Sequence, residues 1–202
     1  MNRKLTARRL ATTSAALAAL AVITGPAVAT AVPAQSVVLL TCQVSTTLDQ
    51  AADQAPDPDG AVTGLVAGAT KKVKYRITNT YTGCTGGNGV VSGSGSGSVT
   101  LDGTCLSALA PAAGTIKWTN GQGATVGNSS WSGSYQLLTT GSGGNAVTTL
   151  VGTGEIDSGL FAHSVGAVPR AAIDGTALSC VTAPTNPIGT VTSSGTIALV
   201  GI

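Results

Sequence analysis

Lys72–Thr78 reads KVKYRIT, a run in which basic and apolar side chains alternate strictly. Successive side chains of a β-strand point to opposite faces of the sheet. Val73, Tyr75 and Ile77 are therefore expected to share a buried face, while the basic residues between them face water. The run predicts a strand of an antiparallel sheet with one face in the core.

The same alternation returns at Thr115–Thr119, which reads TIKWT. Ile116 and Trp118 fall on one face of this strand, so Trp118 is expected in the core. Further apolar, Thr-rich runs are separated mostly by Gly or Pro. These additional predicted strands are Val37–Val44, Ala61–Val66, Val99–Leu101, Ser134–Leu138, Ala146–Val151, Ala171–Leu178 and Thr190–Val200.

The composition supports an all-β fold. The 202 residues include 28 glycines, and only 9% of the chain is charged. Ser, Thr and Val are common, which favours strands and turns over helices. About eight to ten short strands without helical crossovers predict an antiparallel β-sandwich, with a barrel as the second choice.

Two segments are predicted to lie outside the strands. Thr47–Ala55 could hold a helical turn, which would end before the prolines at positions 56 and 58. Ser92–Ser98 alternates Ser and Gly strictly and is expected to form a flexible surface loop within one domain.

The N-terminus has the order of a secretory signal. Four basic residues within positions 3–9 precede an uncharged, mostly apolar run from Ala11 to Val28. Small residues at Ala27 and Ala29 predict cleavage after Ala29, or as late as Ala34. The alternative is an uncleaved membrane anchor, but Gly25-Pro26 and earlier polar residues interrupt the run. We therefore expect a signal at 1–29 and a single secreted domain at 30–202, extracellular or associated with the cell wall, without a membrane segment.

Removal of the signal changes the charge balance. Six basic and eight acidic residues would remain, a net charge of −2. The basic cluster Lys71, Lys72, Lys74 and Arg76 has only Tyr75 as an interleaved aromatic residue, so it is expected to be a solvated strand face. Nucleic acid is not an expected partner.

Four cysteines form an even set in a chain predicted to be exported: Cys42, Cys84, Cys105 and Cys180. Export leads to an oxidising setting, so two disulfides are expected. Of the three connectivities, we favour Cys42 with Cys84 and Cys105 with Cys180, because they clip successive portions of the chain. No C-x-x-C pair is present, so neither a zinc site nor any other cofactor is expected.

Catalytic patterns are weak in this sequence. His163 is the single histidine, and it is expected on a surface loop because no nucleophile motif accompanies it. The enzyme alternative is a secreted hydrolase that acts on a polysaccharide or peptide through loop carboxylates. Glu155 or Asp157 would then pair with Asp102 or Asp174. We expect instead a structural or binding role without catalysis.

Trp131 is the candidate binding residue, because it lies between Ser130 and Ser132 with no pattern to fix its face. A buried position and an exposed binding platform are equally compatible with that context. Loops at one end of the domain are the other candidate contact with an extracellular or cell-wall ligand.

Short motifs also suggest a family. They are Gly114–Trp118 (GTIKW) with Asn120-Gly121, Gly154–Ala162 (GEIDSGLFA) and Leu178–Cys180, together with the early and mid-chain cysteines. In these features the chain resembles a group of small secreted actinobacterial proteins of unknown function. The resemblance implies an exported Gram-positive β-sandwich with paired cysteines, and it implies no catalytic residues.

Overall fold

A computed structural model describes residues 36–51, 64–140, 147–171 and 189–201. All described residues belong to one compact unit, which spans Ala34–Ile202. They form β1 (Val37–Gln50), β2 (Lys71–Gly86), the short 3-10 helix η1 (Gly87–Gly89), β3 (Ser92–Gly103), β4 (Ser107–Thr119), β5 (Thr125–Thr140), β6 (Val147–Gly159), β7 (Ser164–Ala171) and β8 (Thr190–Gly201). Across these ranges, no helix has the length and apolar character needed to span a membrane.

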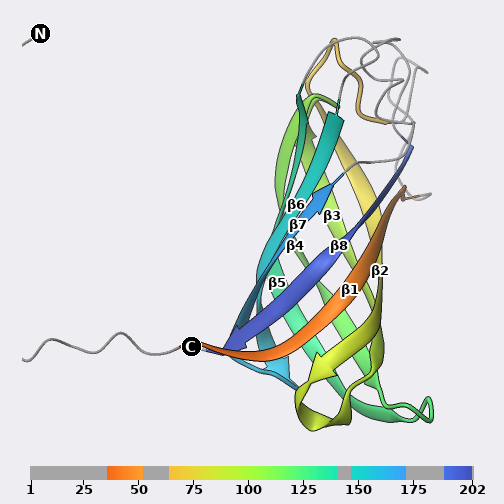
Figure 1. Ribbon diagram of the computed structural model, residues 1–202. Coiled ribbons are helices and arrows are strands. Elements are labelled where there is room, and N and C mark those ends of the chain that lie inside the picture. The colour runs from red at the N-terminus through yellow and green to blue at the C-terminus, as the bar shows by residue number, and fades with distance from the viewer. Residues whose placement is uncertain (1–35, 52–63, 141–146, 172–188, 202) are drawn as a thin grey trace, which may run out of the picture. The chain divides into compact units, whose positions relative to one another are not determined.

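The strands form one closed antiparallel barrel in the order of the chain (Figure 1). β8 returns to β1, so that Thr46 on β1 pairs with Asn79 on β2 on one side and with Ser193 on β8 on the other. The predicted all-β antiparallel fold is confirmed. Because the sheet closes on itself, the fold is a barrel, which was the second choice after a sandwich. Closure pairs both edges of the sheet, so that each of the eight described strands has a neighbour on both sides.

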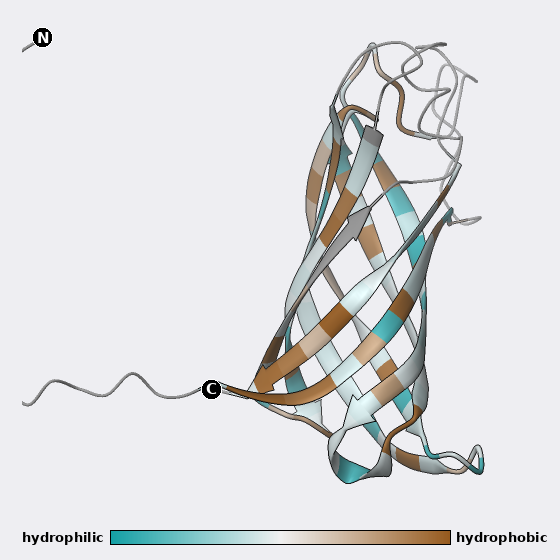
Figure 2. Cartoon of the chain, viewed as in Figure 1, coloured by the Kyte–Doolittle hydropathy of each residue, from teal (hydrophilic) through white to brown (hydrophobic). Residues whose placement is uncertain are grey.

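Side chains alternate between the inside and the outside of the barrel wall. Val73, Tyr75 and Ile77 on β2 are buried, whereas Lys72 and Arg76 are exposed. Figure 2 shows the corresponding alternation of hydrophilic and hydrophobic residues along the strands. The predicted strand at 72–78 and its solvated basic face are therefore confirmed.

The Ser92–Ser98 run is a strand and not the predicted loop, because it belongs to β3. Its glycines face the interior and its serines face outward. A Cβ atom on Gly93 would lie 2.7 Å from Cε3 of Trp118, and one on Gly95 would lie 3.4 Å from Cε2 of Tyr81. The bare inner face of this strand thus leaves room for aromatic rings that neighbouring strands contribute.

The helical turn predicted at Thr47–Ala55 is wrong for its first four residues, which continue β1 to Gln50. Leu48 is fully buried between Ile77 of β2 and Val191 of β8, so sheet pairing and core packing override the local preference. Residues 52–55 lie outside the described chain.

Other predicted segments are described only in part or lie outside the described residues. Within Ala61–Val66, Leu65 forms an isolated bridge rather than a regular strand, and residues 61–63 are not described. Of Ala171–Leu178, only Ala171 is described, as the last residue of β7. The predicted signal and its cleavage sites fall within residues 1–35, outside the described ranges.

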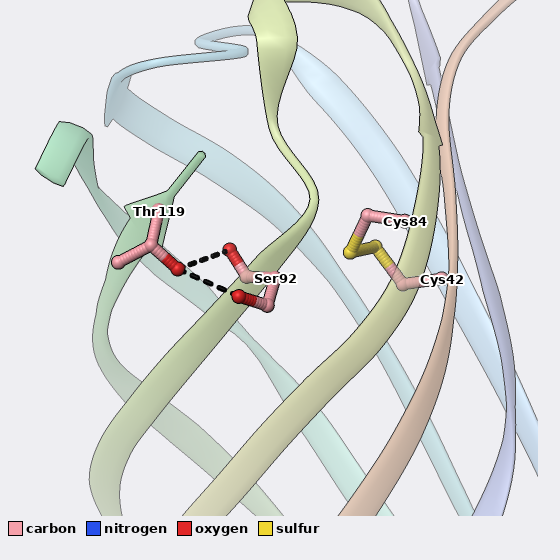
Figure 3. The surroundings of a disulfide bond; sticks show 4 residues. All are labelled: Cys42, Cys84, Ser92 and Thr119. Atoms are coloured by element: carbon pink, nitrogen blue, oxygen red, sulfur yellow. Dashed lines mark hydrogen bonds between the residues drawn. A yellow bond between two sulfur atoms is a disulfide. The ribbon is translucent and has the colours of Figure 1, made fainter. Parts of the chain in front are cut away.

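Cys42 on β1 and Cys84 on β2 form a disulfide, with their Cα atoms 4.1 Å apart (Figure 3). This predicted pair is confirmed. The β1–β2 pairing shifts register between Thr41 and Gln43, at the position of Cys42. Cys105 is buried and is also disulfide-bonded, while its predicted partner Cys180 lies outside the described residues.

Candidate functional site

The aromatic residues of the chain gather inside the barrel, where all six are buried: Tyr75, Tyr81, Trp118, Trp131, Tyr135 and Phe161. Four of them line a cavity of about 60 Å³: Tyr81 from β2, Trp118 from β4, and Trp131 and Tyr135 from β5. The remaining lining comes mainly from β6, β7 and β8, and comprises Asn79, Ile116, Gly152, Thr153, Gly154, Glu155, Ile156, Gly166, Ile197 and Leu199. The barrel therefore holds a small interior space with mostly apolar walls.

Inward-facing glycines make room for these rings. A Cβ atom on Gly152 would lie 3.1 Å from Cε1 of Tyr135, and one on Gly114 would lie 2.9 Å from Nε1 of Trp131. Larger residues at these positions would collide with the aromatic side chains. The glycines thus fix where the rings lie as well as leaving space beside them.

Trp118 lies in the core, as predicted, and its indole N–H is hydrogen-bonded. Its Nε1 donates a hydrogen bond to Oγ of Ser129 at 2.8 Å, and the Ser129 hydroxyl in turn donates to the carbonyl oxygen of Leu160. Its ring centre lies 5.2 Å from that of Tyr81, and 5.7 Å from that of Phe161 in a T-shaped arrangement. Phe161 belongs to the turn between β6 and β7, so this turn packs its ring into the barrel.

Trp131 points inward rather than forming an exposed platform. Its side chain is 9% exposed, and its ring packs edge-on against Tyr135 at 6.1 Å. In contrast to Trp118, its Nε1 is buried and has no hydrogen-bond acceptor among the described residues. Trp131 is therefore buried and lines the cavity, and its indole N–H is a buried donor.

A short row of polar side chains crosses the interior on β8, β1 and β2. Thr46 donates a hydrogen bond from its hydroxyl to Oδ1 of Asn79, and Asn79 lines the cavity. Ser193 pairs with Thr46 across the sheet, is buried, and has no hydrogen-bond partner in the described chain. Its side chain is not part of the cavity lining.

The buried side chains of this interior carry no charge, and Glu155, although it contributes to the cavity lining, is exposed on β6. The buried polar residues in the described ranges are Thr, Asn or Ser, all uncharged. Tyr75, a neutral phenol in the core, has its pKa raised to about 12 because burial disfavours its anion, an effect that a backbone hydrogen bond at Leu65 partly offsets.

The described carboxylates of the hydrolase alternative are exposed on the outer face of the barrel. Glu155 and Asp157 are exposed on β6, and Asp157 accepts a hydrogen bond from Ser132 at 2.8 Å. Asp102 lies on β3, 3.5 Å from Nζ of Lys72, and Asp174 is outside the described residues. No described carboxylate pair faces the cavity, so the hydrolase alternative stays a prediction without a site.

His163 is exposed in the β6–β7 turn, as predicted. Its backbone φ of 66° and the φ of 65° at Phe161 are left-handed values that turn the chain sharply between two adjacent strands. Within the described ranges, no group of three or more His, Cys, Asp or Glu side chains is placed to hold a metal ion.

Sequence reasoning missed Tyr81, Tyr135 and the glycines as parts of one site. Tyr135 was placed in a predicted strand, but its face could not be assigned because Ser, Gly and Gln surround it. The Ser/Gly alternation of β3 was the available signal, since an alternating strand with glycine on one face implies large side chains opposite.

A comparison of the chain with protein-family models, curated proteins and solved structures finds no match.

Proposed function

We propose that this chain is an extracellular binding protein that holds a small uncharged molecule inside its barrel. The observation that carries the proposal is a cavity lined by four aromatic residues, one of which, Trp131, has a buried indole N–H without an acceptor in the described chain. Eight-stranded barrels have interiors that are either filled by side chains or able to hold one small ligand. A mostly apolar pocket with a few polar groups is the usual form of a small-molecule site.

The absence of buried charge among the described residues supports an uncharged ligand. A charged molecule in this interior would lose its hydration without gaining an opposite charge, which costs several kcal/mol or more. An uncharged molecule avoids that cost and gains contact with the rings.

The extracellular assignment rests on the N-terminal signal pattern, the Cys42–Cys84 disulfide and the resemblance to secreted actinobacterial proteins. It is tested by expressing the full chain in an actinobacterial host and sequencing the N-terminus of protein from the culture medium. We expect a mature chain that starts between residues 30 and 35, without free thiols. Retention in the cells with an intact N-terminus would contradict export.

Binding is tested by two-dimensional NMR of ¹⁵N-labelled mature protein against a library of small uncharged fragments. We expect fragments to shift signals of inward-facing residues near Trp131. Gly166→Ala is the blocking variant, because the added methyl group would meet the flexible ends of Leu199 at 3.0 Å and Ile197 at 3.3 Å beside the cavity. Gly68→Ala is its control, since a Cβ atom there meets nothing within 4 Å.

Fragment binding should weaken at least several-fold in Gly166→Ala and stay unchanged in Gly68→Ala. If no fragment shifts an inward-facing signal, or if both variants bind equally well, the cavity is not the binding site and the proposal fails.

A further inference from the structure

We propose that the ligand presents an uncharged hydrogen-bond acceptor that is received by Nε1 of Trp131. This inference rests on the proposed binding function and adds the chemical class of the ligand. Two buried tryptophans of the barrel differ in the hydrogen bonding of their indole N–H groups.

Trp118 and Trp131 lie on the neighbouring strands β4 and β5, and both line the cavity. The Trp118 N–H is bonded to Ser129, whereas the Trp131 N–H has no acceptor within the described residues although its side chain is more than nine-tenths buried. Buried polar groups in proteins nearly always have a partner. The partner of Trp131 is therefore expected to come from a molecule that enters the cavity.

The surroundings of Nε1 limit the direction from which an acceptor can approach. The N–H lies against the inner face of Gly114, which has no side chain to offer an acceptor. Trp131 and Gly114 are directly paired across β5 and β4, and the backbone there belongs to the barrel wall. An acceptor from a bound molecule would therefore have to reach Nε1 from the interior, where Trp131 lines the cavity.

The cavity volume limits the size of the group that binds. One water molecule occupies about 30 Å³ in the liquid, and a cavity must offer at least about 15 Å³ to hold one. By these two measures, the cavity of about 60 Å³ has room for roughly two to four non-hydrogen atoms. Benzene is taken up by an apolar cavity of about 150 Å³ in another protein. The group that fits here is thus smaller than an aromatic ring, such as a carbonyl with its methyl substituents.

Three probes of similar shape test this inference: acetone, isobutene and acetate. Acetone is an uncharged acceptor, isobutene has no acceptor, and acetate is a charged acceptor. The chain has two tryptophans, so ¹⁵N-labelled protein gives two indole N–H signals. Trp131→Phe removes one of them and thereby assigns the other to Trp118.

We expect acetone to shift the Trp131 indole signal and to leave the Trp118 indole signal nearly unchanged. Acetone should bind about fivefold more tightly than isobutene, the ratio expected for one net hydrogen bond, and acetate should not bind. In Trp131→Phe, acetone should lose its advantage while isobutene still shifts inward-facing signals. Gly68→Ala should behave as the unmodified protein.

The outcomes separate the inference from the proposed function. Equal binding of acetone and isobutene would mean that the cavity binds ligands without a hydrogen bond from Trp131. Binding of acetate as tight as that of acetone would contradict the preference for an uncharged acceptor. A long-lived water signal on the Trp131 N–H that persists at saturating acetone would also overturn the inference. If none of the probes or library fragments affects an inward-facing signal, the proposed function itself fails.

Discussion

Gly114 and Trp131 face each other across β4 and β5 so closely that a Cβ atom on Gly114 would lie 2.9 Å from Nε1 of the indole ring. The same atom would lie 2.3 Å from the carbonyl oxygen of Ser96 on β3. The position therefore accepts no side chain, and the indole ring occupies the space that one would fill. Gly114 thus allows both the close approach of β3 and the position of the Trp131 ring.

Gly114→Ala is expected to destabilise the barrel by about 1–3 kcal/mol, the usual cost of adding atoms to a packed interior. The free energy of unfolding, measured by urea denaturation, checks this value. Gly68→Ala adds the same methyl group in open space and should change stability by less than about 0.5 kcal/mol. Equal stability of the two variants would show that the strands around Gly114 accommodate the methyl group without loss of folding free energy.

Ser129→Ala removes the acceptor of the Trp118 N–H and is expected to cost about 1–3 kcal/mol, because a buried donor is left without a partner. Ser130→Ala is the matched control on the next residue, which is only partly buried. Urea denaturation should separate the two variants, and the Trp118 indole proton should exchange faster with solvent in Ser129→Ala. An unchanged exchange rate would mean that the bond to Ser129 contributes nothing measurable.

Replacement of both Cys42 and Cys84 by Ala is expected to lower the free energy of unfolding by about 4 kcal/mol. The two residues are 42 positions apart, and the chain-entropy model gives this value for a closed loop of that length. Urea denaturation without reductant measures the difference between this variant and the parent chain. A loss below about 1 kcal/mol would show that the unfolded chain is already restricted in this region.

Tyr75 should ionise at about pH 12 in the folded protein, against 10.0 for an ordinary tyrosine, because burial disfavours the phenolate. The unfolded chain would release this proton first. The contribution to stability is therefore complete below pH 10 and decreases by up to about 3 kcal/mol as the pH rises from about 10 to 12.

Ultraviolet absorbance of the phenolate, recorded during a pH titration, checks the Tyr75 pKa directly. In Tyr75→Phe, the late-titrating step should disappear, and stability should depend less steeply on pH above pH 10. A late step that persists in this variant would have to come from another tyrosine.

Much of the fold could be predicted from local patterns. The alternation at residues 72–78 and 115–119 identified two strands and their inner faces correctly, including the buried position of Trp118. The Cys42–Cys84 pair was also predicted, as part of the connectivity that clips successive portions of the chain. These features depend on residues that are close in the sequence or on a small number of possible pairings.

The candidate cavity could not be predicted in the same way. Its lining comes from six strands, and the inward face of Trp131 depends on the partners that β5 finds in β4 and β6. The Ser/Gly run was predicted as a loop because Gly/Ser-rich segments are typical of flexible loops and linkers. The run forms part of β3, where its glycines leave room for the aromatic rings inside the barrel.

The sequence by itself determined the class of structure, because a period of two in polarity is a property of each strand, whatever its neighbours. Only the tertiary structure decided that the sheet closes on itself and leaves an indole N–H beside an interior space. Closure requires β8 to pair with β1, more than 140 residues away in the chain, as in Thr190 with Asp49. Pairing over that distance depends on the twist and packing of all eight strands together, which no local pattern encodes.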